Sequence, residues 1–183
     1  MQTLNARDFN SFKTLAKMTQ PKLHNAVFHM LQTLYPINQV HKTPDVVYAI
    51  GDIPICLVAH MDTVFTSPPT EIFYDKEANV IWSPQGLGAD DRAGVFSIFK
   101  ILAAGASNFA ENEPCPFENL KYIVELDRAN AMDCVFYEGG NEKFEQYIES
   151  FGFVTALGTY SDIVEFCPRW NVSGVNLSIG YRD

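Results

Sequence analysis

Short apolar segments alternate with helical patterns along this chain, and that alternation constrains the fold more than any other feature of the sequence. Residues 53–59 (IPICLVA) are apolar at every position, as expected of a strand that is covered on both faces. Residues 120–126 (LKYIVEL) indicate a second buried strand, and residues 92–104 between them have helical periodicity. The sequence therefore predicts an α/β fold with a mixed, mainly parallel central sheet flanked by helices.

Two helices are predicted within residues 1–36. Phe9, Phe12 and Leu15 share one face of the first, and the second has Pro21 in its first turn and ends before Pro36. One face of the second helix is apolar, formed by Leu23, Val27, Met30, Leu31 and Leu34. We expect residues 1–183 to form a single domain, with the helices of residues 1–36 packed on it.

The remaining elements are short. Residues 45–50 and 53–60 flank a Gly-Asp pair and suggest a hairpin, and residues 70–75 and 80–83 suggest a second one. A strand is predicted in residues 134–140, followed by a helix over residues 141–151 with Asn141 as its N-cap. Two final strands are expected in residues 153–157 and 174–179.

Charge and composition exclude several classes of function. The 22 acidic residues outnumber the 13 basic ones, which gives a formal net charge of -9. Such a surface does not attract nucleic acid or anionic lipid, so neither is an expected partner. The sequence lacks a secretory signal pattern and an apolar run of about 20 residues, and its four cysteines form no CxxC pair. We expect a cytoplasmic protein with buried, reduced thiols.

Polar clusters follow the predicted strands, where ligands bind in α/β sheets. His60 and Asp62 come directly after the first apolar strand, and an imidazole beside a carboxylate suits a metal ligand with a supporting acid. Asp90 and Asp91 end a glycine-rich loop, where they could point into a cleft or cap the following helix. Asp127 ends the second strand, where its partner could be Arg128 or a metal ion. His24 and His29 lie on a predicted helix away from these acids and are not expected to bind metal.

In this order, the motifs HMDTV (60–64), GADDRAG (88–94) and Leu126-Asp127 resemble the two-zinc exopeptidase superfamily. That superfamily includes peptidase T, related carboxypeptidases and deacylases, and bacterial leucine aminopeptidases. The resemblance implies a zinc exopeptidase-like catalytic core in which His60, Asp90 and Asp127 bind the first zinc. It further implies that Asp62 orients His60, and that Asp90 bridges two metals and is joined to Asp91 by a cis peptide bond.

The chain departs from the superfamily pattern in the ligands of the second zinc. A Glu-Glu pair, one residue of which is the catalytic base, is missing from residues 105–119, and a strand-helix unit is missing with it. Glu111 and Glu113 lie in this interval, and either could be recruited as a base. No histidine follows His60 to hold the second zinc. Residues 159–162 and 174–181 nevertheless resemble the segments that close the family's cleft, and Asp162 is a candidate site residue there.

These features predict a degenerate metallo-exopeptidase-like protein that binds one divalent metal, Zn²⁺ or alternatively Mn²⁺ or Co²⁺. We expect weak or no peptidase activity and a binding or regulatory role toward a peptide, an amino-acid-derived small molecule or a protein. One alternative is an active single-metal aminopeptidase or amidohydrolase in which Asp62, Glu111 or Glu113 assists catalysis. Another is a metal-free structural or interaction protein in which Asp90 and Asp127 pair with Arg92 and Arg128.

Overall fold

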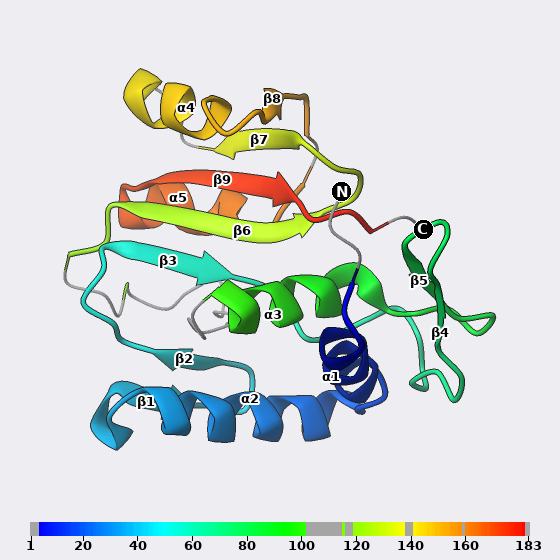
Figure 1. Cartoon of the computed structure of the whole chain (residues 1–183). Helices are drawn as coiled ribbons and strands as arrows, with labels where there is room; N and C mark the ends of the chain where they lie inside the picture. The colour runs from blue at the N-terminus through cyan, green and yellow to red at the C-terminus, as the bar shows by residue number, and fades with distance from the viewer. Residues whose placement is uncertain (1–3, 102–114, 116–118, 138–140, 159, 182–183) are drawn as a thin grey trace.

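A computed structural model describes residues 4–101, 115, 119–137, 141–158 and 160–181. Its centre is a five-stranded sheet in the order β3-β6-β9-β7-β8 (Figure 1). The strands are β3 (Ile55–Val58), β6 (Tyr122–Arg128), β9 (Ser173–Ser178), β7 (Asp133–Tyr137) and β8 (Val154–Thr155). All neighbouring pairs are parallel except β7 and β9, which are antiparallel. The predicted α/β fold with a mixed, mainly parallel sheet is therefore confirmed.

Helices cover both faces of this sheet (Figure 1). Side chains of α2 (Gln20–Leu34) and α3 (Ala89–Ile101) form one core with Leu126 of β6. Ile123, also in β6, packs against α5 (Ile163–Trp170) in a separate core. Because alternate residues of a strand point to opposite faces, β6 contributes to both layers and is buried between them.

The N-terminal helices agree with the sequence prediction. The side chain of Asn5 caps α1 (Ala6–Ala16) by accepting a hydrogen bond from the Asp8 N–H, and Pro21 lies in the first turn of α2. Asn141 caps α4 (Glu142–Glu149) in the same way, by accepting from the Phe144 N–H. None of the helices in the described part of the chain is both long enough and apolar enough to cross a membrane.

One predicted hairpin is present and the other is wrong. β4 (Phe73–Asp75) and β5 (Val80–Trp82) pair as expected. However, β2 (Val47–Ala49) pairs with β1 (Val40–Lys42), which follows the short 3₁₀ helix Ile37–Gln39, and β3 instead pairs in parallel with β6. The tight turn runs over residues 43–46, where the Thr43 hydroxyl accepts a hydrogen bond from the Val46 N–H at 3.0 Å. Thus the apolar pattern identified both strands but not their partners.

Candidate metal centre

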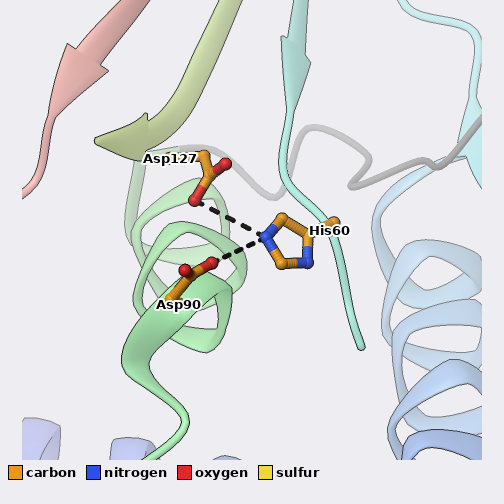
Figure 2. A group of neighbouring side chains, drawn as sticks. All are labelled: His60, Asp90 and Asp127. Atoms are coloured by element: carbon orange, nitrogen blue, oxygen red, sulfur yellow. Dashed lines mark hydrogen bonds and ion pairs between the residues drawn. The ribbon is translucent and has the colours of Figure 1, made fainter. Parts of the chain in front are cut away.

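Three side chains from distant parts of the sequence meet beyond one end of β3 and β6 (Figure 2). His60 Nε2 lies 2.8 Å from Asp90 Oδ1 and 3.5 Å from Asp127 Oδ1. One ligand atom from each residue lies within 4.8 Å of the others. The sequence predicted all three residues as ligands, and the structure brings all three together. This group of three side chains could hold a metal ion.

The sheet explains why two of these residues are neighbours. Val58 of β3 is in register with Glu125 of β6, and the strands are parallel. The carboxyl ends of both strands therefore reach the same edge of the sheet. His60 lies two residues after Val58, and Asp127 lies two residues after Glu125, so both side chains are at this edge.

Gly94 allows α3 to bring Asp90 to the same edge. A Cβ atom at this position would lie 2.2 Å from the backbone oxygen of Leu126 and 2.3 Å from Asp91 Oδ1. Any larger side chain would therefore push the helix away from β6, which carries Asp127. This close approach is a physical reason for glycine at the end of the GADDRAG motif.

The two adjacent aspartates have different roles. Asp90 faces His60, whereas the fully buried Asp91 accepts hydrogen bonds from the backbone N–H groups of Gly94 at 2.8 Å and His60 at 3.2 Å. Burial raises the pKa of Asp91 well above its usual range, and the charge of Asp127 adds to this effect. The peptide bond between Asp90 and Asp91 is cis, as the resemblance implied. Asp91 therefore takes the helix-capping role that the sequence allowed for this pair, whereas Asp90 faces His60.

His60 is held from both ring nitrogens. Its Nδ1 lies 3.1 Å from Asp62 Oδ1, on the side opposite Asp90. Burial lowers the pKa of His60, but the hydrogen bond and charge of Asp127, together with the charges of Asp91 and Asp62, raise it to about 11. The nearby carboxylates therefore favour the protonated ring, and a metal ion at Nε2 would compete with that proton.

The two arginines do not neutralise this acidic group. Arg92 is buried and donates through Nη1 to the carbonyl oxygens of Ala16 and Met18, at 2.7 and 2.6 Å. Arg128 pairs with Asp133 at 2.8 Å. The predicted pairing of these two arginines with Asp90 and Asp127 is therefore not found in the described part of the chain. Arg92 caps the carbonyl end of α1, and β6 directs Arg128 toward β7.

One imidazole nitrogen and two carboxylate oxygens make up the donor set of this group, which could hold a metal ion. The side chains of Asp90 and Asp62 are 49% and 60% exposed, so the site is open to solvent.

The other residues that the sequence suggested for the site are not part of this group. Glu111 and Glu113 lie outside the described residues. Asp162 lies at the start of α5, where burial raises its pKa and the charges of Asp127 and Asp62 add to this rise.

The sequence did not predict a role for Asn176, whose side chain contacts the backbone of Asp127. The only signal for it was a polar residue inside the apolar pattern of residues 174–179.

Comparisons with known proteins do not assign the chain to a family. No family model matches it, and no match was found among curated proteins. The functional argument therefore depends on the residues of this site. Within the described part of the chain, His60, Asp90 and Asp127 form the one cluster of histidine, cysteine and acidic side chains with suitable spacing for a metal ion.

Proposed function

We propose that this protein binds one Zn²⁺ ion through His60, Asp90 and Asp127 and uses it to bind a peptide or an amino-acid-derived small molecule. Peptidase activity would be weak or absent, as in a degenerate relative of the two-zinc exopeptidases. The convergence of two carboxylates on one imidazole at an open edge of the sheet carries this proposal.

Electrostatics supports a bound cation. Asp90 and Asp127 face the same imidazole, and Asp62 and Asp91 add negative charge close by. Among the described residues, the lysine and arginine ion pairs are made elsewhere, by Lys100 with Asp8 and by Arg128 with Asp133. A divalent ion would neutralise this concentration of charge more completely than one protonated imidazole does.

The chain's own residues would hold and orient the ion. Asp62 would fix the ring of His60 through Nδ1 and leave Nε2 for the metal, as carboxylates commonly do beside zinc-bound histidines. Asp91 would fix the His60 backbone from the start of α3. When bound, Zn²⁺ would supply an electrophile for a carbonyl or carboxylate group of the ligand. Mn²⁺ and Co²⁺ are the alternative ions.

Weak hydrolysis is proposed because the Glu-Glu pair of the superfamily is missing from the sequence. A positioned general base contributes about 10²–10⁴-fold to a rate. Asp62 is already engaged by His60 Nδ1, so it is poorly suited to accept a proton from an attacking water. A working hydrolase with Glu111 or Glu113 as base remains the second candidate function.

Metal stoichiometry tests the first part of the proposal. The metal-stripped chain is titrated with Zn²⁺ by calorimetry, alongside Asp127→Asn and the control Asp52→Asn, which removes an exposed charge outside the site. We expect about one equivalent for the unmodified chain and the control, and at least tenfold weaker binding for Asp127→Asn. Equal binding by all three proteins, or no binding at all, would contradict the proposed site.

Ligand binding and hydrolysis test the second part. Amino-acid amides and dipeptides are added to the protein with Zn²⁺, Mn²⁺ or Co²⁺, and both binding and cleavage are measured. Metal-dependent binding with little cleavage is the expected result. Rapid cleavage that is lost in Asp90→Ala and in a Glu111 or Glu113 variant would instead favour the single-metal hydrolase.

A further inference from the structure

Strand β6 has an irregularity directly at Asp127. Glu125 is in register with Asn176 of β9, and Arg128 is in register with Ser178. Between these two pairs, β6 advances by three residues while β9 advances by two, so β6 contains one extra residue. Such a bulge interrupts the backbone ladder and changes the direction of nearby side chains. Asp127 lies within this interruption.

The side chain of Asn176 replaces the interrupted ladder. Its Oδ1 accepts a hydrogen bond from the Asp127 N–H at 3.1 Å, and its Nδ2 donates to the Asp127 carbonyl oxygen at 3.2 Å. One primary amide therefore satisfies both backbone polar groups of Asp127, as a neighbouring peptide unit would.

Asn176 is itself held in place. Its side chain is buried in the sheet, with 5% of the residue exposed. Its Nδ2 also lies 3.3 Å from the Ser161 hydroxyl oxygen, and Ser161 in turn donates to the carboxylate of Glu125. The direct partners of the amide thus come from two elements, the segment before α5 and strand β6. Because the amide makes hydrogen bonds in several directions, it has little freedom to rotate.

We infer that Asn176 is a positioning residue that fixes the backbone of the metal ligand Asp127 at the bulge, and so aims its carboxylate at His60. This inference rests on the proposed function, because it assumes that Asp127 binds metal. Without the amide, the backbone of Asp127 would lose both hydrogen bonds at the point where β6 leaves the ladder. The carboxylate would then occupy the ligand position for a smaller fraction of the time.

The size of the expected effect follows from other metal sites. Replacement of groups that orient a ligand typically weakens metal binding by about 10–100-fold. Asn176→Leu has nearly the same shape but cannot hydrogen bond, so it tests the amide rather than the volume. Ser178→Ala is the matched control, because Ser178 is also buried in β9 and its hydroxyl bonds to Asp133 rather than to Asp127.

Two measurements test the inference. The first is hydrogen exchange in the metal-free protein, where we expect the Asp127 amide to be protected in the unmodified chain and in Ser178→Ala. In Asn176→Leu this amide should exchange at least tenfold faster, while that of Val124 changes much less. The second is Zn²⁺ titration, in which Asn176→Leu should bind about 10–100-fold more weakly than Ser178→Ala.

The outcomes separate this inference from the proposed function. If the unmodified chain binds no metal, the proposed function fails, and the role of Asn176 in metal binding fails with it. If the unmodified chain binds Zn²⁺ but Asn176→Leu binds it as tightly as Ser178→Ala, only the inference is overturned. Rapid exchange of the Asp127 amide in the unmodified chain would also overturn it, and this measurement does not require the variant to fold.

Discussion

The imidazole of His60 lies between two carboxylates, with Asp62 on Nδ1 at 3.1 Å and Asp90 on Nε2 at 2.8 Å. These acids come from different elements, since Asp62 follows β3 and Asp90 begins α3. Asp62 therefore orients the ring through Nδ1, the nitrogen that does not face Asp90 and Asp127. Asp90 lies on the Nε2 side of the ring, and so does Asp127 (Figure 2).

Replacing His60 should remove most of the metal affinity. His60→Ala deletes the only nitrogen donor of the group, so we expect Zn²⁺ binding to weaken by about 100-fold or more. His29→Ala is the control, because His29 is an exposed residue of α2 that contacts Gln32. Metal analysis after equilibrium dialysis should show loss of Zn²⁺ in the first variant alone. Similar losses in both variants, or in His24→Ala, would make the ligand assignment wrong.

Asp62 should matter less for metal binding than the three proposed ligands. Asp62→Ala leaves His60 able to bind metal but frees its ring to rotate and to change tautomer. We expect about tenfold weaker Zn²⁺ binding, at the low end for such groups because the Asp62 side chain is 60% exposed. Calorimetric titration beside Asp52→Ala measures the difference. A loss as large as that of His60→Ala would indicate that Asp62 binds the metal directly.

The resemblance named His60, Asp90 and Asp127 together, and sheet topology explains why two of them, His60 and Asp127, lie close to each other. Parallel strands place their carboxyl ends at one edge, so polar residues that follow β3 and β6 must approach one another. The glycine-rich segment before α3 then brings Asp90 to the same edge. The arginine partners could not be predicted, since Arg92 bonds to the carbonyl groups of Ala16 and Met18, more than 70 residues away in sequence.

The wrong hairpin and the missed α5 have local causes. Apolar patterning identifies buried strands but carries no information about which neighbour they pair with, so β2 and β3 were joined incorrectly. The α5 segment has only eight residues and contains Pro168, which is unfavourable inside a helix. Its helical state depends on packing of Ile163, Phe166 and Cys167 against the sheet. Asn176 was missed because its partner is the backbone of a residue 49 positions away.

Substitution of Gly94 should destabilise the fold and the site together. In Gly94→Ala, the new Cβ would meet the Leu126 carbonyl oxygen and the Asp91 carboxylate at under 2.5 Å, so α3 must shift away from β6. We expect a loss of about 2–3 kcal/mol in the free energy of unfolding, typical of overpacking a close contact. Urea unfolding measures this loss.

Gly51→Ala is the matched control for that prediction. Its Cβ would lie 3.4 Å from the Tyr35 ring, an ordinary contact, so its stability should be almost unchanged. Zn²⁺ binding should weaken in Gly94→Ala and not in Gly51→Ala. A Gly94→Ala protein as stable as the control would mean that the close approach of α3 to β6 does not constrain the site.

Glu125 should give the metal-free protein an unusual pH dependence. Glu125 is 1% exposed, and burial raises the pKa of its carboxyl group to about 8, an effect that the Ser161 hydrogen bond opposes and the Asp127 charge reinforces. An acid with a raised pKa holds its proton more tightly when folded. Its ionisation therefore destabilises the folded state progressively as pH rises from its unfolded pKa near 4.5 to about 8.

Glu125→Gln removes this ionisable group while keeping an oxygen that accepts from Ser161. The variant and the unmodified chain should have similar free energies of unfolding near pH 4, because Glu125 is then protonated in both states. At pH 8 the variant should be more stable, by on the order of a few kcal/mol, since each pKa unit corresponds to about 1.4 kcal/mol. Urea unfolding of the metal-free proteins at several pH values measures the difference. A constant difference across this range would show that Glu125 ionises normally, because only a shifted group makes the two proteins diverge with pH.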